Sequence, residues 1–505
     1  MLTLRSSADG WRGQIGVSFT PAAAGLLAAA VLDVLSAGGP LRRILISHDG
    51  RRGGPAVAAA VQAAVGDRLA RTAELLGGVP TPVASAAVSA GEFDLAFLVT
   101  ASHNPAEWNG LKVKSGVAGS ISPAMERQIE GRYLELAAAE TAAPAAAGAG
   151  PGRGVRPDVG PGAAAGSPQP MIEAHLAQVL ARVGGKPGPS WRVVIDGLHG
   201  IAGPAMVRLA ELLGWTAHPI GCEPDPDFGG LTPDPTLAAS RRRLSAAVRA
   251  HRADFGIVLD GDGDRVFLLG SDGGLVGCGE LYALLLGQLY RSHPELPSRR
   301  IAVTSTTTSL PGRVAAEHGG EVFVTGVGFK NMAALLAGGQ ICAAGGNVGD
   351  LAFAPYGFDR DPSVVVALLS RLLADSDQSL DAALEALRSR YGRRHHLETS
   401  VSCPAGELDL PATATAVLAN TGLGLEVESM DRVDGVRLAL PERQWLSVRR
   451  SSTENLVRAY AEFSGPVLSE TQLQAALQAA LRPSTATDAA DAADAADATE
   501  PTHDT

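Results

Sequence analysis

The chain repeats one pattern three times: an apolar run, a turn, an alanine-rich segment of helical length, and later a second apolar run that ends in a polar loop. The first runs are 44–46, 193–195 and 301–303, the helical segments lie near 55–66, 204–213 and 311–318, and the second runs are 95–99, 255–259 and 341–344. Strands that alternate with helices favour α/β layers joined by right-handed crossovers. The sequence therefore predicts three similar α/β/α sandwich domains, each with a functional loop at an equivalent strand end.

Two segments differ in composition from these repeats. Residues 138–168 are almost entirely Ala, Gly and Pro, which predicts a flexible linker. Residues 483–505 carry Asp-Ala-Ala repeats without an apolar face, which predicts a disordered acidic tail. We expect no catalytic role for this tail.

Charge and cysteine usage narrow the class of protein. The net charge of −11 comes largely from the acidic tail, and nothing basic remains that would attract nucleic acid. Neither an apolar run of about 18 residues nor an N-terminal leader is evident, so we expect a cytoplasmic protein rather than a membrane-bound or secreted one. The four cysteines lack CxxC spacing and are predicted to be buried thiols in a reducing compartment: Cys222, Cys278, Cys342 and Cys403.

A hydroxyl and an imidazole stand side by side directly after the apolar run 95–99. Ser102 and His103 occupy the loop that Pro105 separates from any continuing strand. Open α/β sheets place their chemistry at the carboxyl ends of strands. A Ser-His pair also ends many loops that have no catalytic role, so Ser102 is a candidate nucleophile only in combination with the next two motifs.

Three carboxylates alternate with glycine after the run 255–259. Asp260, Asp262 and Asp264 would raise one another's pKa without a counter-charge, and the glycines let the backbone curl so that their oxygens converge. Hard oxygen ligands favour Mg²⁺ or Ca²⁺ over zinc. The alternative is an acidic turn in contact with solvent.

A third motif runs from Arg449 to Asn455. A strand-like segment, 446–448, is followed by two arginines. The Ser-Ser-Thr-Glu that comes next is typical of a helix N-terminus with free N–H groups. Such a cluster predicts a phosphate site. A capped helix beside a surface arginine is the alternative.

These three segments, in this order and at these separations, resemble the α-D-phosphohexomutases, the phosphoglucomutase and phosphomannomutase group. Shorter stretches agree: residues 9–13, 47–51, 196–200, 325–330 and 458–460. The resemblance covers roughly residues 1–480 and implies a fourth, smaller α+β domain at the C-terminal end, with the domains arranged around a central cleft. The expected segments are 1–137 with the phosphoserine loop, 138–168 as linker, 169–268 with the metal loop, 269–385 with the sugar-recognition loop, 386–482 with the phosphate-binding loop, and 483–505 as tail.

The resemblance implies an isomerase, an intramolecular phosphotransferase that moves a phosphoryl group between the 1- and 6-type hydroxyls of a sugar. Ser102 would carry the phosphate, the intermediate would be a bisphosphate, and a sugar bisphosphate would act as activator. Mg²⁺ would bridge the phosphate to Asp260, Asp262 and Asp264. The expected partner is a small phosphosugar, bound by a monomer or homodimer that takes neither nucleic acid nor membrane.

The resemblance also assigns roles around the phosphoryl group. The cations expected there are Arg12, Lys112 and Arg265. His103 is a candidate acid or base, and the alternative is that it only orients the loop. The phosphate that is not reacting would be held by Arg449, Ser451, Ser452 and Thr453. Lysine is rare in this chain, so Lys112 and Lys330, which lie inside motifs, are expected to serve the chemistry.

The sugar-recognition loop departs from the family. The family usually has Gly-Glu-x-Ser-Gly, where this chain has Asn347 in place of Glu and Gly349 in place of Ser. The candidate sugar-recognition residues are Lys330, Gly346, Asn347, Gly349 and Asp350. A neutral amide replaces a carboxylate, and charge-assisted hydrogen bonds are roughly twice as strong as neutral ones. Two lesser departures are Ala8 in place of a hydroxyl residue and Asp361-Pro362 in place of Asp-Gly.

These departures predict an atypical substrate, such as a modified sugar, cyclitol or nucleoside-linked phosphate. In the alternative, Asp350 supplies the missing carboxylate and the protein is an ordinary phosphoglucomutase or phosphomannomutase of primary metabolism. Two other classes stay open, a phosphosugar phosphatase and a non-catalytic binding protein. The sequence does not name the substrate or the oligomeric state.

Overall fold

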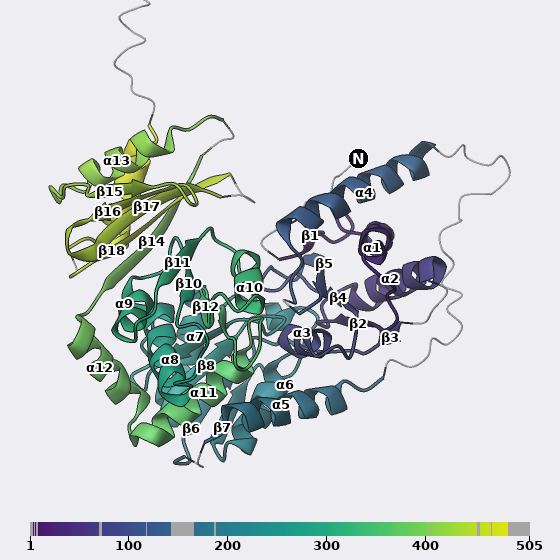
Figure 1. Ribbon diagram of the computed structural model, residues 1–505, viewed down its shortest axis with the longest axis horizontal. Helices are drawn as coiled ribbons and strands as arrows, with labels where there is room; N and C mark the ends of the chain where they lie inside the picture. Colours follow the sequence, from purple (N-terminus) through teal and green to yellow (C-terminus); the bar gives the residue numbers. More distant parts are fainter. Residues whose placement is uncertain are drawn as a thin grey trace, which may run out of the picture. The chain divides into compact units, whose positions relative to one another are not determined.

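The computed structural model describes residues 9–69, 73–117, 119–142, 166–185, 188–403, 406–451, 455–465 and 467–482, together with Leu4 and Ser6 (Figure 1). The chain forms two compact units, Met1–Gly392 and Arg393–Thr505, which are described separately. The tail 483–505, most of the predicted linker, and Ala8 lie outside the described residues.

The first domain is a five-stranded sheet with helices on its faces (Figure 1). Its strands are β1 (Trp11–Gln14), β2 (Ile44–His48), β3 (Glu74–Leu75), β4 (Leu95–Val99) and β5 (Trp108–Ser115), and its helices are α1 (Pro21–Ser36), α2 (Gly54–Leu69), α3 (Thr81–Ser89) and α4 (Pro123–Ala142). Every residue of β4 is buried, as expected for a strand covered on both faces. Helix α1 begins where the Thr20 hydroxyl accepts a hydrogen bond from the Ala23 amide and Pro21 fixes the first turn.

The second and third domains have four-stranded sheets. The second contains α5 (Gln169–Val183), β6 (Arg192–Asp196), α6 (Gly203–Leu212), β7 (Thr216–Ile220), the 3-10 turn η1 (Phe228–Gly230), α7 (Ala238–His251), β8 (Phe255–Leu259) and β9 (Val266–Leu269). The third contains α8 (Cys278–Ser292), β10 (Ile301–Thr304), α9 (Leu310–Glu317), β11 (Val322–Thr325), α10 (Lys330–Ala337), β12 (Ala343–Gly345), β13 (Leu351–Phe353), α11 (Pro362–Ser376) and α12 (Leu380–Tyr391).

The three sheets share one topology, which confirms the predicted repeat. In each sheet one strand (β2, β6 or β10) pairs in parallel with the next strand of the chain (β3, β7 or β11) on one side and with the one after it (β4, β8 or β12) on the other. The strand that follows (β5, β9 or β13) pairs antiparallel with β4, β8 or β12. The orders are β3-β2-β4-β5, β7-β6-β8-β9 and β11-β10-β12-β13, and the first sheet adds β1 beyond β5. Three loops occupy equivalent positions in these sheets. The serine loop, which carries Ser102, connects β4 to β5; the aspartate loop, 260–264, connects β8 to β9; and the candidate sugar-recognition loop, 346–350, connects β12 to β13.

The predicted helices agree closely with the structure, since α2, α6 and α9 differ by no more than a turn at either end from the expected segments. Helix α4 continues to Ala142, five residues into the segment predicted as linker. The individual domain boundaries stay predictions. All four cysteines are free thiols, with Cys222 and Cys342 buried. In the described part of the chain, every helix is too short or too polar to cross a membrane.

The second unit is an antiparallel sheet with two helices, which agrees with the expected smaller α+β domain. Its elements are β14 (His395–Ser402), α13 (Leu410–Asn420), β15 (Ser429–Asp431), β16 (Val436–Leu440), the 3-10 turn η2 (Pro441–Arg443), β17 (Gln444–Arg450), β18 (Leu456–Phe463) and α14 (Glu470–Ala480). The strand order is β14-β18-β17-β16-β15. The helix predicted after Arg450 is wrong, because Leu456–Phe463 forms β18, which pairs antiparallel with β17 and places Val457 opposite Arg450.

Candidate active site

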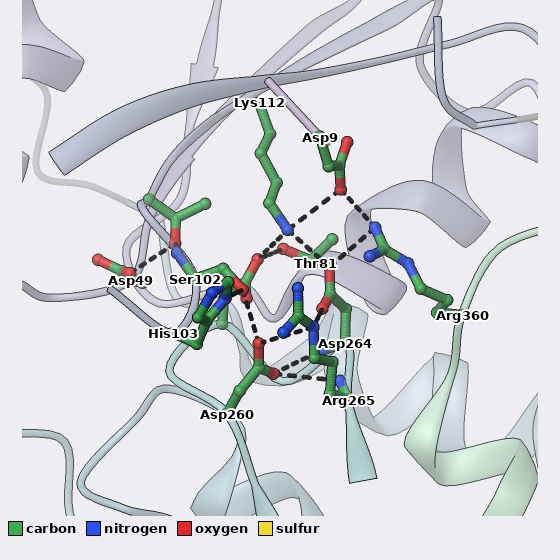
Figure 2. A network of polar contacts seen from close by, with 12 residues as sticks. Asp9, Asp49, Thr81, Ser102, His103, Lys112, Asp260, Asp264, Arg265 and Arg360 are labelled. Carbon is green, nitrogen blue, oxygen red and sulfur yellow. Dashed lines mark hydrogen bonds and ion pairs between the residues drawn. The ribbon is translucent and has the colours of Figure 1, made fainter. Parts of the chain in front are cut away.

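Ser102 lies in the loop between β4 and β5 and is fully buried. Its Oγ donates to Asp260 Oδ2 over 2.6 Å, so the serine loop of the first sheet meets the aspartate loop of the second (Figure 2). The backbone of Ser102 is in the left-handed region, with φ of 52°, which is uncommon for a residue with a side chain. The Ser102 amide donates to Thr100 Oγ1 over 2.9 Å, so the strained residue is held on its own loop.

Each aspartate of the β8–β9 loop has at least one oxygen that accepts a hydrogen bond from the chain. Asp260 Oδ1 accepts from the backbone amides of Asp264 and Arg265, at 3.0 and 3.1 Å. Asp262 Oδ2 accepts from Thr81 Oγ1 at 2.6 Å and from Lys112 Nζ at 2.7 Å. Asp264 Oδ2 accepts from the same Lys112 Nζ at 2.6 Å.

The other oxygens differ in their surroundings. Asp260 Oδ2 accepts from Ser102, whereas Asp262 Oδ1 and Asp264 Oδ1 are buried and have no hydrogen-bond partner among the residues that the structure describes. One ligand oxygen from each aspartate lies within 4.8 Å of the others. Burial and the neighbouring charges of Asp264 and Asp262 raise the pKa of Asp260 to about 8. Unpartnered hard oxygens that repel one another fit a divalent cation, so this cluster can hold a metal such as Mg²⁺.

Lys112 supplies a counter-charge to two of the aspartates, Asp262 and Asp264. Burial alone would lower its pKa, but Asp262, Asp264 and Asp9 raise it, so the ammonium stays charged. Arg265 Nε lies 3.9 Å from Asp260 Oδ2. Arg12 Nη1 donates to Asn104 Oδ1 over 2.8 Å on the serine loop. The three cations predicted around the phosphoryl group therefore lie beside the serine loop or the aspartate loop.

His103 lies beside the nucleophile candidate, with Nδ1 3.4 Å from Ser102 Oγ. Burial, together with the charges of Arg265 and Arg12, lowers the pKa of His103 well below its ordinary value. The imidazole is therefore neutral near pH 7 and can accept a proton.

Several buried charged residues were missed by the sequence reasoning. Arg360, from the loop before α11, pairs with Asp9 and places Nη2 3.0 Å from Asp264 Oδ2 (Figure 2). Lys114 Nζ lies 2.7 Å from Asp359 Oδ2 and joins β5 to the third domain. The scarcity of lysine that marked Lys112 applies equally to Lys114, two residues further along the same strand, and could have identified it.

Comparison with known proteins gives the family. Models of the phosphoglucomutase/phosphomannomutase α/β/α domains I, II and III match residues 5–140, 172–273 and 279–391. The chain belongs to the α-D-phosphohexomutase family. The predicted enzyme class, an isomerase of the phosphohexomutase type, is confirmed at the level of this family.

Relatives of this phosphohexomutase align over nearly their whole length. A phosphoglucosamine mutase of Saccharopolyspora erythraea is 29% identical over 464 residues, covering 90% of this chain and 94% of the relative. A phosphoglucosamine/phosphogalactosamine mutase of Sulfurisphaera tokodaii is 26% identical, covering 90% and 94%. The solved structure of a phosphoglucomutase/phosphomannomutase family protein from Burkholderia thailandensis has a TM-score of 0.71 at 20% identity, covering 94% of this chain and 96% of that one, and so shows the shared fold.

In the loop 346–350, the candidate for sugar recognition, Asp350 and Asn347 both accept hydrogen bonds from other groups of the protein. Asp350 is buried, and its Oδ1 accepts from the amides of Gly346 at 3.1 Å and Val348 at 3.4 Å. Asn347 Oδ1 accepts from Thr306 Oγ1 at 3.1 Å. Gly349 has φ of +75°, and a Cβ there would lie 2.3 Å from the Val266 carbonyl oxygen. The serine that the family usually has at this position therefore does not fit this loop.

Two other expected residues are engaged by carboxylates. Lys330 Nζ lies 2.6 Å from Glu126 Oε2, in the first turn of α4. Arg449, in the second unit, places Nε 3.0 Å from Asp434 Oδ2, and the Ser451 amide donates to the Leu456 carbonyl over 2.9 Å. Ser452 and Thr453 lie outside the described residues.

Proposed function

We propose that this protein is a phosphosugar mutase that moves a phosphoryl group between the 1- and 6-type hydroxyls through a phosphoserine at Ser102. The observation that supports this most strongly is the 2.6 Å contact of Ser102 Oγ with Asp260 beside two unpartnered carboxylate oxygens. Neither a surface serine nor a simple acidic turn would produce this buried arrangement of hydroxyl, carboxylates and cations.

The chemistry needs positioning and charge stabilisation more than covalent assistance. The Ser102 Oγ–P bond breaks as a bond forms from phosphorus to a sugar hydroxyl oxygen, and the proton of that hydroxyl passes to a base. His103 is the candidate base, because its Nδ1 lies 3.4 Å from Ser102 Oγ. Mg²⁺, held by Asp260, Asp262 and Asp264, would neutralise charge on the transferring group. In the second half-reaction the serine recovers the phosphate from the opposite position of the bisphosphate.

The cations have distinct tasks in this proposal. Lys112, Arg265 and Arg12 stabilise the phosphoryl oxygens, and Arg449 with Ser451, Ser452 and Thr453 binds the phosphate that is not reacting. A sugar bisphosphate activates the enzyme by phosphorylating Ser102. The pairing of Arg449 with Asp434 supports this role, because it orients the guanidinium at the end of β17.

We further propose a substrate that differs from plain glucose or mannose phosphate. Asp350 is a poor replacement for the missing glutamate, because it is buried and its Oδ1 accepts from two amides of its own loop, and Asn347 offers a neutral group. Because relatives are named as phosphoglucosamine mutases, we would test hexosamine phosphates first among modified sugars.

Phosphorus NMR on a panel of phosphates tests the proposal. The panel contains glucose, mannose, glucosamine and cyclitol phosphates with Mg²⁺ and glucose 1,6-bisphosphate. We expect primary and anomeric phosphate signals to interconvert for at least one modified sugar, with total organic phosphate conserved. Stoichiometric release of inorganic phosphate would instead indicate a phosphatase. Glucose 1-phosphate as the best substrate would overturn the atypical-substrate proposal.

Asn347→Glu tests the recognition loop directly. Restoring the carboxylate should raise kcat/KM for glucose 1-phosphate by about tenfold, roughly 1.4 kcal/mol, because charge-assisted hydrogen bonds to sugar hydroxyls are stronger than neutral ones. Asn347→Gln is the control and should give no gain. An equal effect of both substitutions would mean that charge at this position does not limit recognition.

A further inference from the structure

Arg51, in the loop after β2, is fully buried, and its two terminal nitrogens donate to backbone carbonyls of the serine loop and of the strand that follows it. Its Nη2 donates to the Ser102 carbonyl over 2.8 Å, and its Nη1 donates to the Trp108 carbonyl over 2.7 Å. Nη1 also lies 3.4 Å from the Asn104 carbonyl oxygen and 3.5 Å from that of Pro105. One guanidinium therefore connects the start, middle and end of the loop that carries the nucleophile.

Asp49 binds the same arginine and is connected to the Ser102 amide through the Thr100 hydroxyl. Arg51 Nε donates to Asp49 Oδ2 over 2.8 Å, and the Thr100 hydroxyl donates to that oxygen over 2.6 Å. Thr100 Oγ1 in turn accepts from the Ser102 amide, so both backbone polar groups of Ser102 depend on the Asp49–Arg51 pair. Figure 2 shows Asp49 on the side of Ser102 away from Arg265.

This restraint acts on a strained residue. A left-handed backbone is unfavourable for a residue with a side chain, so it persists only where surrounding contacts require it. At Ser102 those contacts are the hydrogen bonds to its amide and its carbonyl. Without them, we expect the loop to relax to an ordinary conformation that aims Oγ elsewhere.

The second domain packs against the same group. The Phe228 ring centroid lies 5.0 Å from Arg51 Cζ, and a Cβ on Gly261 would lie 2.6 Å from the Ser102 carbonyl oxygen. The first glycine of the aspartate loop thus touches the carbonyl that Arg51 holds. Arg51 therefore contacts both the serine loop and Phe228 of the second domain.

We propose that Arg51 is a positioning residue for phosphoryl transfer, holding Ser102 in the left-handed conformation that aims Oγ at Asp260. This inference rests on the proposed phosphoserine chemistry. Arg51 acts through the carbonyl of Ser102 and not on the reacting atoms. Lysine cannot replace it, because a single ammonium lacks the planar fork that reaches Asp49, Ser102 and Trp108 together.

The test is the rate of phosphorylation of the full-length protein by glucose 1,6-bisphosphate with Mg²⁺, followed by intact mass and peptide mapping. Arg51→Lys should slow phosphorylation of Ser102 by about 100-fold, as expected for a misplaced nucleophile, while the bisphosphate concentration for half-maximal rate changes less than about threefold. Arg52→Lys is the matched control, since Arg52 is exposed and pairs with Asp227, and its rate should equal wild type.

Two further measurements separate positioning from general stability. The phosphorus NMR shift of phosphorylated Ser102 should change in Arg51→Lys at temperatures where the protein is fully folded. In Arg51→Ala, added guanidinium should restore the rate at least tenfold over equal methylammonium; if that variant fails to fold, Arg51→Lys decides alone. A wild-type rate and shift in Arg51→Lys would overturn this inference but leave the proposed function intact, whereas wild-type protein that is never phosphorylated on Ser102 would overturn both.

Discussion

Each aspartate of the β8–β9 loop has one oxygen fixed by backbone or side-chain donors, and in Asp262 and Asp264 the second oxygen has no hydrogen-bond partner among the described residues. Buried carboxylate oxygens without partners are costly, so they are retained where a ligand completes them. The fixed oxygens orient the carboxylates before a metal arrives. This arrangement supports a preformed site, in which the ligands are already oriented before the metal binds.

Thr81 offers the most selective test of this preorganisation. Its hydroxyl donates to Asp262 Oδ2 and its amide donates to the Asp262 carbonyl over 3.0 Å. Thr81→Val keeps the backbone contact and the side-chain shape but removes the hydroxyl, and should weaken Mn²⁺ or Mg²⁺ affinity about 10–100-fold by calorimetry. Thr81→Ser should retain wild-type affinity; equal affinity in both variants would show that this hydroxyl does not orient the ligand.

Sequence reasoning could bring Ser102 to Asp260 because both follow apolar strands of similar domains. It could not find Thr81, Arg360 or Asp359. Thr81 is the first residue of a helix, and the other two lie in an irregular loop, so none belongs to a local pattern. Their function depends on the docking of one domain against another, which short-range periodicity does not encode.

Among the elements, the loop 346–350 shows that the role of one side chain depends on the backbone conformation of the residues beside it. Asp350 closes the loop on the amides of Gly346 and Val348, and Gly349 takes a left-handed conformation against the Val266 carbonyl. The sequence predicts that this loop departs from the family pattern, and that stays a prediction. It could not show that Asp350 is directed inward, because that depends on backbone conformation.

Gly349→Ser tests this conformation. The new side chain would be in an unfavourable backbone region and would collide with the Val266 carbonyl, so we expect a loss of about 1–3 kcal/mol and a lower Tm. Gly357→Ser is the control, because the space around Gly357 is open. If the two variants melt alike, the loop has another conformation in solution.

The segment after Arg450 was predicted to begin a helix because Ser-Ser-Thr-Glu is a capping pattern. The structure instead continues as β18, paired antiparallel with β17. Capping signals are local, whereas the strand is stabilised by its pairing and by the buried side of the sheet. Tertiary pairing therefore overrides the local signal here.

For the whole molecule, the sequence predicted the number, class and common topology of the first three domains, since apolar periodicity determines which segments become strands and helices. It did not anticipate that their junction is charged. Lys114 of the first domain and Asp359 of the third are both buried, and the Ser85 hydroxyl donates to the same Asp359 oxygen over 2.7 Å.

Lys114→Met tests whether this buried pair stabilises the first unit. Removing the ammonium leaves the Asp359 and Asp9 carboxylates with one cation fewer, and breaking a buried pair costs about 3–5 kcal/mol. The Tm should fall clearly. The control is Arg300→Met, because Arg300 pairs with Glu321 at the surface and exposed pairs contribute about 0–1 kcal/mol. Equal Tm values for the two variants would contradict a stabilising role.

The proposed chemistry requires that a phosphate on Ser102 shares a metal ion with Asp260, Asp262 and Asp264. Electron–nuclear double resonance on phosphorylated protein loaded with Mn²⁺ tests this arrangement directly. We predict phosphorus coupling of a directly coordinated phosphate, lost in Ser102→Ala. Mn²⁺ bound without such coupling, or coupling that persists in Ser102→Ala after removal of free phosphate, would contradict it.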